Sequence, residues 1–208
     1  MMYRNLHSLI LLLGLIQNLL HEMDGGIPYQ RINVEVSDCV DKMEESCSEQ
    51  KQHHNKMNDT IALDIFPPLT DDSPYSTNFN KSSPIILFQP GLRCHSNDLP
   101  GNSIVRKAYE SGFRSIVVNR RGLIQPLKNP RLNIFGDVDD LEQVYHFIKR
   151  ELVTQDTPFF LHGISAGTAV TVSALSKWDR RRVEHPDKDT PVFVASVDVV
   201  PGYDISTV

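Results

Sequence analysis

The sequence has few cysteines and no excess of basic residues, and each of these absences excludes a class of protein. Three of the 208 residues are cysteines, at positions 39, 47 and 94, an odd and sparse number that does not describe a disulfide framework. We therefore expect free thiols and a reducing compartment. The 21 Lys and Arg residues against 26 Asp and Glu give a formal net charge of −5, which argues against a general nucleic-acid binder.

A run of apolar residues long enough to cross a bilayer is missing near the N-terminus. The stretch Leu9–Ile16 is far shorter than the roughly 20 residues that a spanning helix needs. Arg4 before it fits a signal peptide, which would make the protein secreted, but no small-residue cleavage site follows. The alternative is an amphipathic helix over about 5–22, closed by Gly25 and Gly26. We expect the helix, with a cytoplasmic protein or one in peripheral contact with a membrane.

The composition is typical of one globular domain, and the chain divides into two parts. Residues 1–83 would hold the N-terminal helix, a hairpin formed by the alternating stretches Arg31–Ser37 and Thr60–Ile65, and a loop between its strands. That loop, 38–58, is polar, so we expect it to be exposed and mobile. It carries Cys39, Cys47, His53 and His54, whose spacing matches no structural zinc pattern, and we expect no metal or other cofactor.

Residues 84–208 alternate between apolar strands and amphipathic helices, the pattern of βαβ units. Such units build a mostly parallel sheet with helices on both faces, so the fold class is α/β. The expected buried strands are Ile85–Gln89, Ser115–Asn119, Pro158–His162 and Pro191–Val200, and the expected helices are Gly101–Ser111, Gly136–Leu152 and Thr168–Trp178.

The motif Gly163-Ile164-Ser165-Ala166-Gly167 carries most of the functional information. It fits G-x-S-x-G, and it follows an expected strand and opens an expected helix, as a nucleophile elbow does. At such a sharp turn the neighbours of the serine must be small, and the hydroxyl projects above the carboxyl end of the sheet. The pattern therefore predicts Ser165 as a catalytic nucleophile.

A second segment, Gln89-Pro90-Gly91-Leu92, ends the first strand of the parallel series. In serine hydrolases built on such a sheet, the loop after this strand provides one N–H group of the oxyanion hole, and the residue after the nucleophile provides the other. This assigns the backbone N–H groups of Leu92, or alternatively Arg93, and of Ala166.

Together these segments resemble the α/β-hydrolase fold, and more narrowly the lipases and esterases that include YheT-type hydrolases and medium-chain ethyl ester synthases. The match extends over nearly the whole chain except 38–58. The family's "NPHLQT" motif corresponds to Asn5-Leu6-His7, and its "ALDW" strand corresponds to Asp59–Asp64. Its "PGL" and "NxRG" motifs correspond to Pro90-Gly91-Leu92 and Asn119–Gly122. Two later segments of the family correspond to 130–141 and Pro201–Asp204. Ala166 and Thr168 depart from the family's elbow, which usually has a larger apolar residue and a glycine there.

The resemblance implies an acyl-serine mechanism on a small ester or lipid, such as a short- or medium-chain ester or a monoacylglycerol, by hydrolysis or by transfer to an alcohol. It also favours the N-terminal helix over a signal peptide. We expect Arg121 to be a structural hydrogen-bonding residue beneath the site rather than a substrate ligand.

The acid and the histidine that should follow the nucleophile in chain order are missing. His185 is expected at the opposite end of the sheet, while Asp198 and Asp204 are only weak alternatives for the acid, and His95 at the mouth of the site is not expected to be the base. We expect a C-terminally incomplete hydrolase without activity of its own. The alternatives are a non-catalytic interaction protein of the same fold and a secreted binding protein. In an incomplete chain the last strand would form a bare apolar edge.

Overall fold

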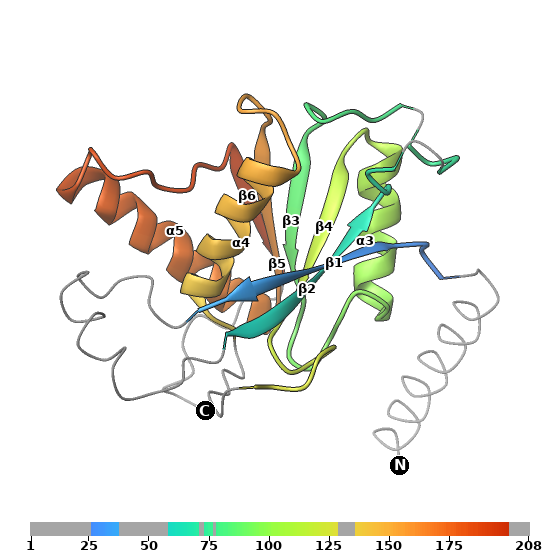
Figure 1. Ribbon diagram of the computed structural model, residues 1–208, viewed down its shortest axis with the longest axis horizontal. Helices are drawn as coiled ribbons and strands as arrows, with labels where there is room; N and C mark the ends of the chain where they lie inside the picture. Colours follow the sequence, from blue (N-terminus) through green and yellow to red (C-terminus); the bar gives the residue numbers. More distant parts are fainter. Residues whose placement is uncertain (1–25, 38–57, 71–72, 77, 129–135, 200–208) are drawn as a thin grey trace, which may run out of the picture.

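The alternating and continuous apolar stretches form one six-stranded mixed sheet, shown in Figure 1. The computed structural model describes residues 26–37, 58–70, 73–76, 78–128 and 136–199. The helix expected over 5–22, residues 38–57 of the expected loop, the motif Pro201–Asp204 and residues 130–135 of the segment 130–141 lie outside the described residues. The predictions made for them therefore remain predictions.

The strand order is β1-β2-β4-β3-β5-β6. The first two strands pair antiparallel as the expected hairpin, and β2 also runs antiparallel to β4. The other four strands are mutually parallel. The bounds are Gln30–Val36 for β1, Asp59–Phe66 for β2, Ile85–Gln89 for β3, Arg114–Asn119 for β4, Phe159–Ile164 for β5 and Ala195–Val199 for β6.

Helices cover both faces of the sheet, as the βαβ pattern predicts. The helix α3 (Leu99–Glu110) packs Val105 against Phe88 and Val117 on one face. On the other face lie α4 (Val138–Glu151) and α5 (Ala166–Glu184), which form the larger core with alternate residues of the same strands. In Figure 1, α3 lies to the right of the strands and α4 and α5 to the left.

Local sequence signals set several helix ends. The Asp137 carboxylate accepts a 2.9 Å hydrogen bond from the Asp139 N–H, which caps α4. Gly112, with φ of 84°, follows the end of α3 in the left-handed conformation that glycine adopts most easily. Both boundaries agree with the helices predicted from the sequence.

Two elements differ from their predicted extent. The helix α5 continues to Glu184 rather than Trp178, because the polar stretch after Trp178 contains good helix formers and needs no apolar stripe where it is exposed. The last strand is shorter than predicted and is not buried: Val197 keeps 59% of its surface exposed, since β6 stands at the end of the sheet in the described part of the chain. Within these residues β6 thus presents exposed apolar side chains.

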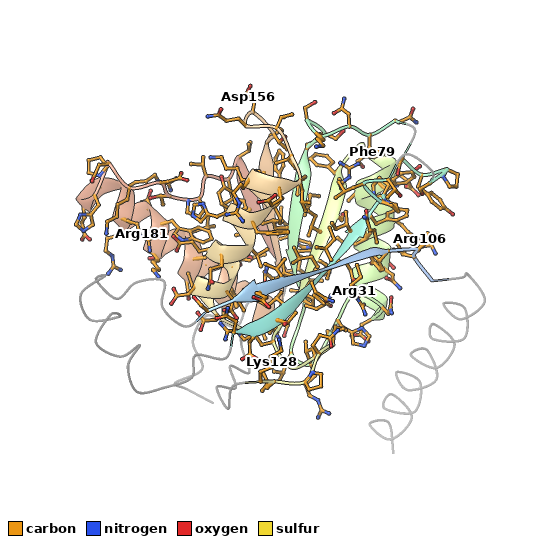
Figure 2. All side chains as sticks on the ribbon, viewed as in Figure 1. Arg31, Phe79, Arg106, Lys128, Asp156 and Arg181 are labelled. Atoms are coloured by element: carbon orange, nitrogen blue, oxygen red, sulfur yellow. The ribbon has the colours of Figure 1, made fainter. Side chains whose placement is uncertain are left out.

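The strand order places a topological switch point between β3 and β5. The chain leaves β3 toward α3 on one face and leaves β5 toward α5 on the other, so their following loops diverge at the carboxyl edge. In Figure 2, Lys128 lies at this edge and Asp156, which precedes β5, at the opposite one. Ligands of open α/β sheets bind in the crevice at such a point.

Within the described residues no helix is long and apolar enough to cross a membrane. The same part of the chain contains no group of three or more His, Cys, Asp or Glu side chains that could hold a metal ion.

Candidate active site

The turn between β5 and α5 holds Ser165 in a strained conformation. Its φ of 51° and ψ of −118° are rarely adopted by residues with a side chain. Hydrogen bonds fix this backbone: the Ser165 N–H donates to the Val199 carbonyl at 2.9 Å, and the Ser165 carbonyl accepts from the N–H and the hydroxyl of Thr168 at 2.9 and 2.6 Å. A strained residue persists where its surroundings hold it in place, and such residues concentrate at functional sites.

Both glycines of the motif are required by close packing. A Cβ at Gly163 would stand 2.7 Å from a carboxylate oxygen of Asp198 and 2.9 Å from the Thr168 backbone nitrogen. A Cβ at Gly167 would overlap the Gln89 carbonyl oxygen and lie 2.8 Å from its carbon. The absence of these two side chains lets α5 begin directly against the end of β3, and the serine therefore sits beside the loop that follows β3.

That loop packs closely on the elbow. A Cβ on Gly91 would stand 3.7 Å from the Ser165 Cβ, which is ordinary contact distance. The chain then turns from Gly91 to Cys94, closed by a 3.2 Å hydrogen bond from the Cys94 N–H to the Gly91 carbonyl, with Arg93 at φ of 58°. In the described residues, Arg93 and Ser165 are the non-glycine residues with positive φ, so the strained backbone positions gather at one place.

The structure brings the two predicted oxyanion donors to the same edge. Leu92 follows Gly91 in the loop, and Ala166 is the first residue of the 19-residue helix α5. Neither backbone N–H group donates to another described residue. The first N–H groups of a helix have no partner within the helix and carry its positive dipole end, which favours developing negative charge nearby.

A pocket of about 190 Å³ opens between the β3 loop and the elbow and includes Ser165. Its walls are largely apolar, formed by Phe88, Pro90, Leu92 and Ile164. Leu92 is 45% exposed, which is unusual for a large apolar side chain and places it at the rim. The pocket suits the apolar part of a small molecule beside the serine.

Three titratable side chains, Cys94, His95 and Asp98, line the same pocket. The imidazole Nδ1 of His95 accepts from the Asn97 N–H at 3.2 Å and lies 3.8 Å from the Asp98 carboxylate. When it is neutral, His95 therefore carries its proton on Nε2 and presents a donor rather than a base. Burial, followed by the nearby charge of Asp98, raises the pKa of the Cys94 thiol and keeps it protonated.

The other acid and base alternatives lie elsewhere. His185 follows α5 at its far end, roughly 28 Å along the helix axis from Ser165, as expected. The Asp198 carboxylate accepts from the Thr171 hydroxyl and so faces α5. His162, whose position the sequence did not single out, stacks on Phe88 and shares a 2.6 Å hydrogen bond with the Val197 carbonyl. The described residues place no histidine on the Ser165 hydroxyl.

Buried polar groups fix the β3 loop at both ends. At its start, the guanidinium of Arg120 donates to the Gly91 carbonyl at 2.9 Å and to the Pro90 carbonyl. At its end, the Ser96 N–H donates to the Asn119 amide oxygen at 3.0 Å, and the Ser96 hydroxyl donates to Asp64. Sequence analysis missed Arg120 and Asp64, because their partners lie about 30 positions away along the chain. The only signal for them was their place in segments with family resemblance.

Asp64 is completely buried and carries several charge-assisted bonds. Burial raises its pKa, but hydrogen bonds from Arg31, Ser96 and Asn119 lower it more, so the pKa lies below its usual value. Figure 2 shows Arg31 on β1, from which it reaches Asp64 with two 2.7 Å bonds. The carboxylate thus ties three strands to the end of the loop.

Arg121 has the structural role expected for it. Its Nε donates to Asp140 at 2.7 Å, and a second nitrogen lies 3.4 Å from Asp59. These contacts join the second residue after β4 to the start of α4 and to the start of β2. No contact of Arg121 in the described residues reaches the pocket at Ser165.

Similar architecture is found among solved structures. The structure of DcsB in complex with its substrate analogue superimposes with a TM-score of 0.50 at 16% identity, covering 86% of this chain and 48% of that one. The α/β hydrolase GrgF from Penicillium sp. sh18 gives 0.48 at 19% identity, covering 83% and 46%. A putative carboxylesterase from Lactobacillus plantarum WCFS1 gives 0.48 at 13% identity, covering 82% and 59%.

This chain has the α/β-hydrolase fold. No family model matches the sequence, and no curated protein matches it. The identities are low enough that the likeness establishes the fold alone, and the narrower resemblance to YheT-type hydrolases stays a prediction. The chain spans about half of the length of these α/β-hydrolase-fold structures.

Proposed function

We propose that this chain provides the nucleophile and the oxyanion hole of a serine ester hydrolase. One observation carries the proposal: Ser165 is held at φ of 51° in a G-x-S-x-G turn that packs against the loop after β3. Strain of this kind at a nucleophile elbow is what exposes a serine hydroxyl at the carboxyl edge of such a sheet.

In the proposed reaction, the Ser165 oxygen attacks the ester carbonyl carbon as its proton passes to a general base. The carbonyl oxygen becomes an oxyanion, which accepts from the N–H groups of Leu92 and Ala166. The bond to the leaving alcohol then breaks, the alcohol takes up the proton, and an acyl-serine remains. Water releases the carboxylic acid and restores the serine, while an alcohol in place of water would form a new ester.

The lining of the pocket supports an apolar substrate group. Phe88, Pro90, Leu92 and Ile164 provide no hydrogen-bonding side chains, so a hydrocarbon acyl or alcohol group would contact them without loss of polar hydration. We propose short- or medium-chain esters or monoacylglycerols as substrates, in line with the family resemblance.

The general base and its acid would come from outside the described residues. His95 presents a protonated Nε2, His185 lies at the far end of α5, and Asp198 bonds to Thr171. Without a base the serine hydroxyl is a poor nucleophile, although an oxyanion hole and substrate binding alone retain about 10³- to 10⁴-fold catalysis in serine proteases. We therefore propose that the 208-residue chain reacts slowly through Ser165.

A non-catalytic interaction protein of the same fold is the second proposal. Exposed valines on β6 and directly before it favour it, since Val194, Val197 and Val199 keep 65%, 59% and 40% of their surfaces exposed. An apolar edge strand of this kind is a surface that another chain could cover.

Labelling with a fluorophosphonate probe tests the two proposals. The matched control is Ser173→Ala, which removes an exposed serine from the same helix. Peptide mass spectrometry should find the adduct at Ser165, lost in Ser165→Ala and retained in Ser173→Ala. If Ser165 in the folded chain reacts no faster than Ser173, the hydrolase proposal is wrong and the interaction protein is favoured.

A further inference from the structure

Arg120 binds the carbonyl end of the peptide group whose N–H is a proposed oxyanion donor. Its guanidinium Nη1 donates to the Gly91 carbonyl at 2.9 Å, and that carbonyl belongs to the same peptide group as the Leu92 N–H. Its Nη2 donates to the Pro90 carbonyl, one peptide earlier. The side chain is 8% exposed and comes from the residue directly after β4, the strand beside β3.

We infer that Arg120 is a positioning residue of the oxyanion hole: it orients the Gly91–Leu92 peptide group and strengthens the Leu92 N–H as a hydrogen-bond donor. The inference rests on the proposed function, because it concerns the donor that Leu92 would provide. It adds a residue that the catalytic motif does not contain and that contacts neither the serine nor the substrate.

The reason is the polarity of the peptide group. A cationic donor on the carbonyl oxygen draws electron density from the amide nitrogen, so the N–H at the other end of the group becomes more positive. Charge-assisted hydrogen bonds are roughly twice as strong as neutral ones, and in a buried site solvent weakens them little. The Leu92 N–H therefore stabilises an oxyanion better when Arg120 is in place.

The surroundings fix the guanidinium as well as the peptide. A Cβ on Gly136, whose φ is 99°, would stand 3.1 Å from the Arg120 Nε, so the space beside the side chain exists because this residue is glycine. The far end of the loop is held separately through Ser96 by Asn119 and Asp64. Loss of the Arg120 contacts should therefore disturb the first residues of the loop and leave its end in place.

Arg114 is a matched control inside the same protein. It is also buried, at 2% exposed, and it also donates to two backbone carbonyls, those of Pro67 at 3.2 Å and of Asn80 at 3.0 Å. It lies at the amino end of β4, away from the pocket at Ser165. Arg114→Lys and Arg120→Lys both keep the charge and disturb a similar set of bonds, but only the second affects the Gly91–Leu92 peptide.

The first readout compares, for each variant, the rate of fluorophosphonate labelling at Ser165 with the melting temperature. Arg120→Lys and a second variant, Arg120→Gln, should slow labelling by about 10- to 100-fold, less than the 10²- to 10³-fold lost with a whole oxyanion donor. Arg114→Lys should lower the melting temperature by a similar amount and leave the labelling rate within about twofold of wild type. If Arg114→Lys slows labelling as much as Arg120→Lys does, Arg120 has no special role in positioning the oxyanion donor.

The second readout does not depend on reactivity. In ¹H–¹⁵N spectra, the Leu92 amide should move upfield in Arg120→Lys and Arg120→Gln, because its N–H loses polarisation, and should stay in place in Arg114→Lys. An unchanged Leu92 resonance in both Arg120 variants overturns the inference. If wild-type Ser165 fails to label, the proposed function is wrong, and the Leu92 resonance still decides whether Arg120 polarises this peptide.

Discussion

The backbone of Gly167 lies against the carbonyl group of Gln89, with room for no side chain between them. A Cβ at position 167 would overlap the carbonyl oxygen and stand 2.9 Å from the next carbonyl, that of Pro90. This contact sets the distance between α5 and the end of β3, and with it the distance between the proposed nucleophile and the loop that would hold the oxyanion.

Gly167→Ala should therefore destabilise the folded protein, although alanine is the better helix former. The new methyl group meets backbone atoms that cannot move aside, so we expect a loss of about 3 kcal/mol in the free energy of unfolding, at the upper end for overpacking. Urea unfolding followed by fluorescence of the single, fully buried Trp178 would measure it. Gly26→Ala is the control, because nothing lies within 4 Å of a Cβ there. Equal stability of the two variants would contradict the packing described.

Asp64→Asn should destabilise the protein and loosen the end of the β3 loop. An amide replaces one acceptor oxygen of the carboxylate with an NH2 donor and removes the negative charge, while Arg31, Ser96 and Asn119 are all donors themselves. We expect a loss of about 3 kcal/mol, as for one partner of a buried ion pair. Glu110→Gln breaks the exposed pair with Lys107 and should change the stability little, because solvent screens a surface ion pair. A similar small loss in Asp64→Asn would show that the carboxylate is not needed.

Glu142 should make the protein sensitive to acid. Burial raises its pKa, but hydrogen bonds from His146, Arg181 and Trp178 outweigh it and lower the pKa from 4.5 to about 2. Figure 2 shows Arg181 on α5, from which it reaches this α4 carboxylate. Because the folded-state pKa is depressed, the contribution is complete above pH 4.5 and is lost as pH falls toward about 2.

The free energy of unfolding, measured from neutral pH down to about 2, should thus fall more steeply for wild type than for Glu142→Gln. Glu184→Gln, which removes an exposed glutamate of α5, should keep the wild-type slope. Parallel pH profiles for wild type and Glu142→Gln would mean that Glu142 is not held in its charged form.

The β6 edge should promote self-association of this chain. Lysine on an edge strand discourages pairing with other strands, so Val197→Lys should lower the association measured by sedimentation velocity. Val183 is 80% exposed but lies near the end of α5, away from the sheet edge. Val183→Lys should therefore change association little. If the two substitutions act alike, general hydrophobicity and not the strand edge drives association.

The sequence predicted the elements whose signals are local. The apolar runs at Ile85–Gln89 and Pro158–His162, which lie in β3 and around the start of β5, and the glycine after α3 each depend on residues a few positions apart. The elbow at Ser165 was found for the same reason, since five consecutive residues define it.

The remaining features depend on distant parts of the chain. The bonds from Arg120 to the β3 loop and from Ser96 to Asp64 join residues about 30 positions apart, and no periodicity reports them. The exposure of β6 could not be read from its apolar residues, because a strand at the end of a sheet and one in its middle can have the same sequence pattern. Its burial depends on what lies beside it.

The pH dependence of fluorophosphonate labelling tests the central claim most directly: Ser165 is a strained, oxyanion-supported nucleophile without a working base among the residues that the structure describes. We predict adduct formation at Ser165 with a rate that rises about tenfold per pH unit and shows no plateau, since hydroxide must remove the proton. A rate that levels off above the histidine pKa of about 6.5 would show that a histidine base is present. A rate no greater than that of Ser173 would show that Ser165 is not a nucleophile.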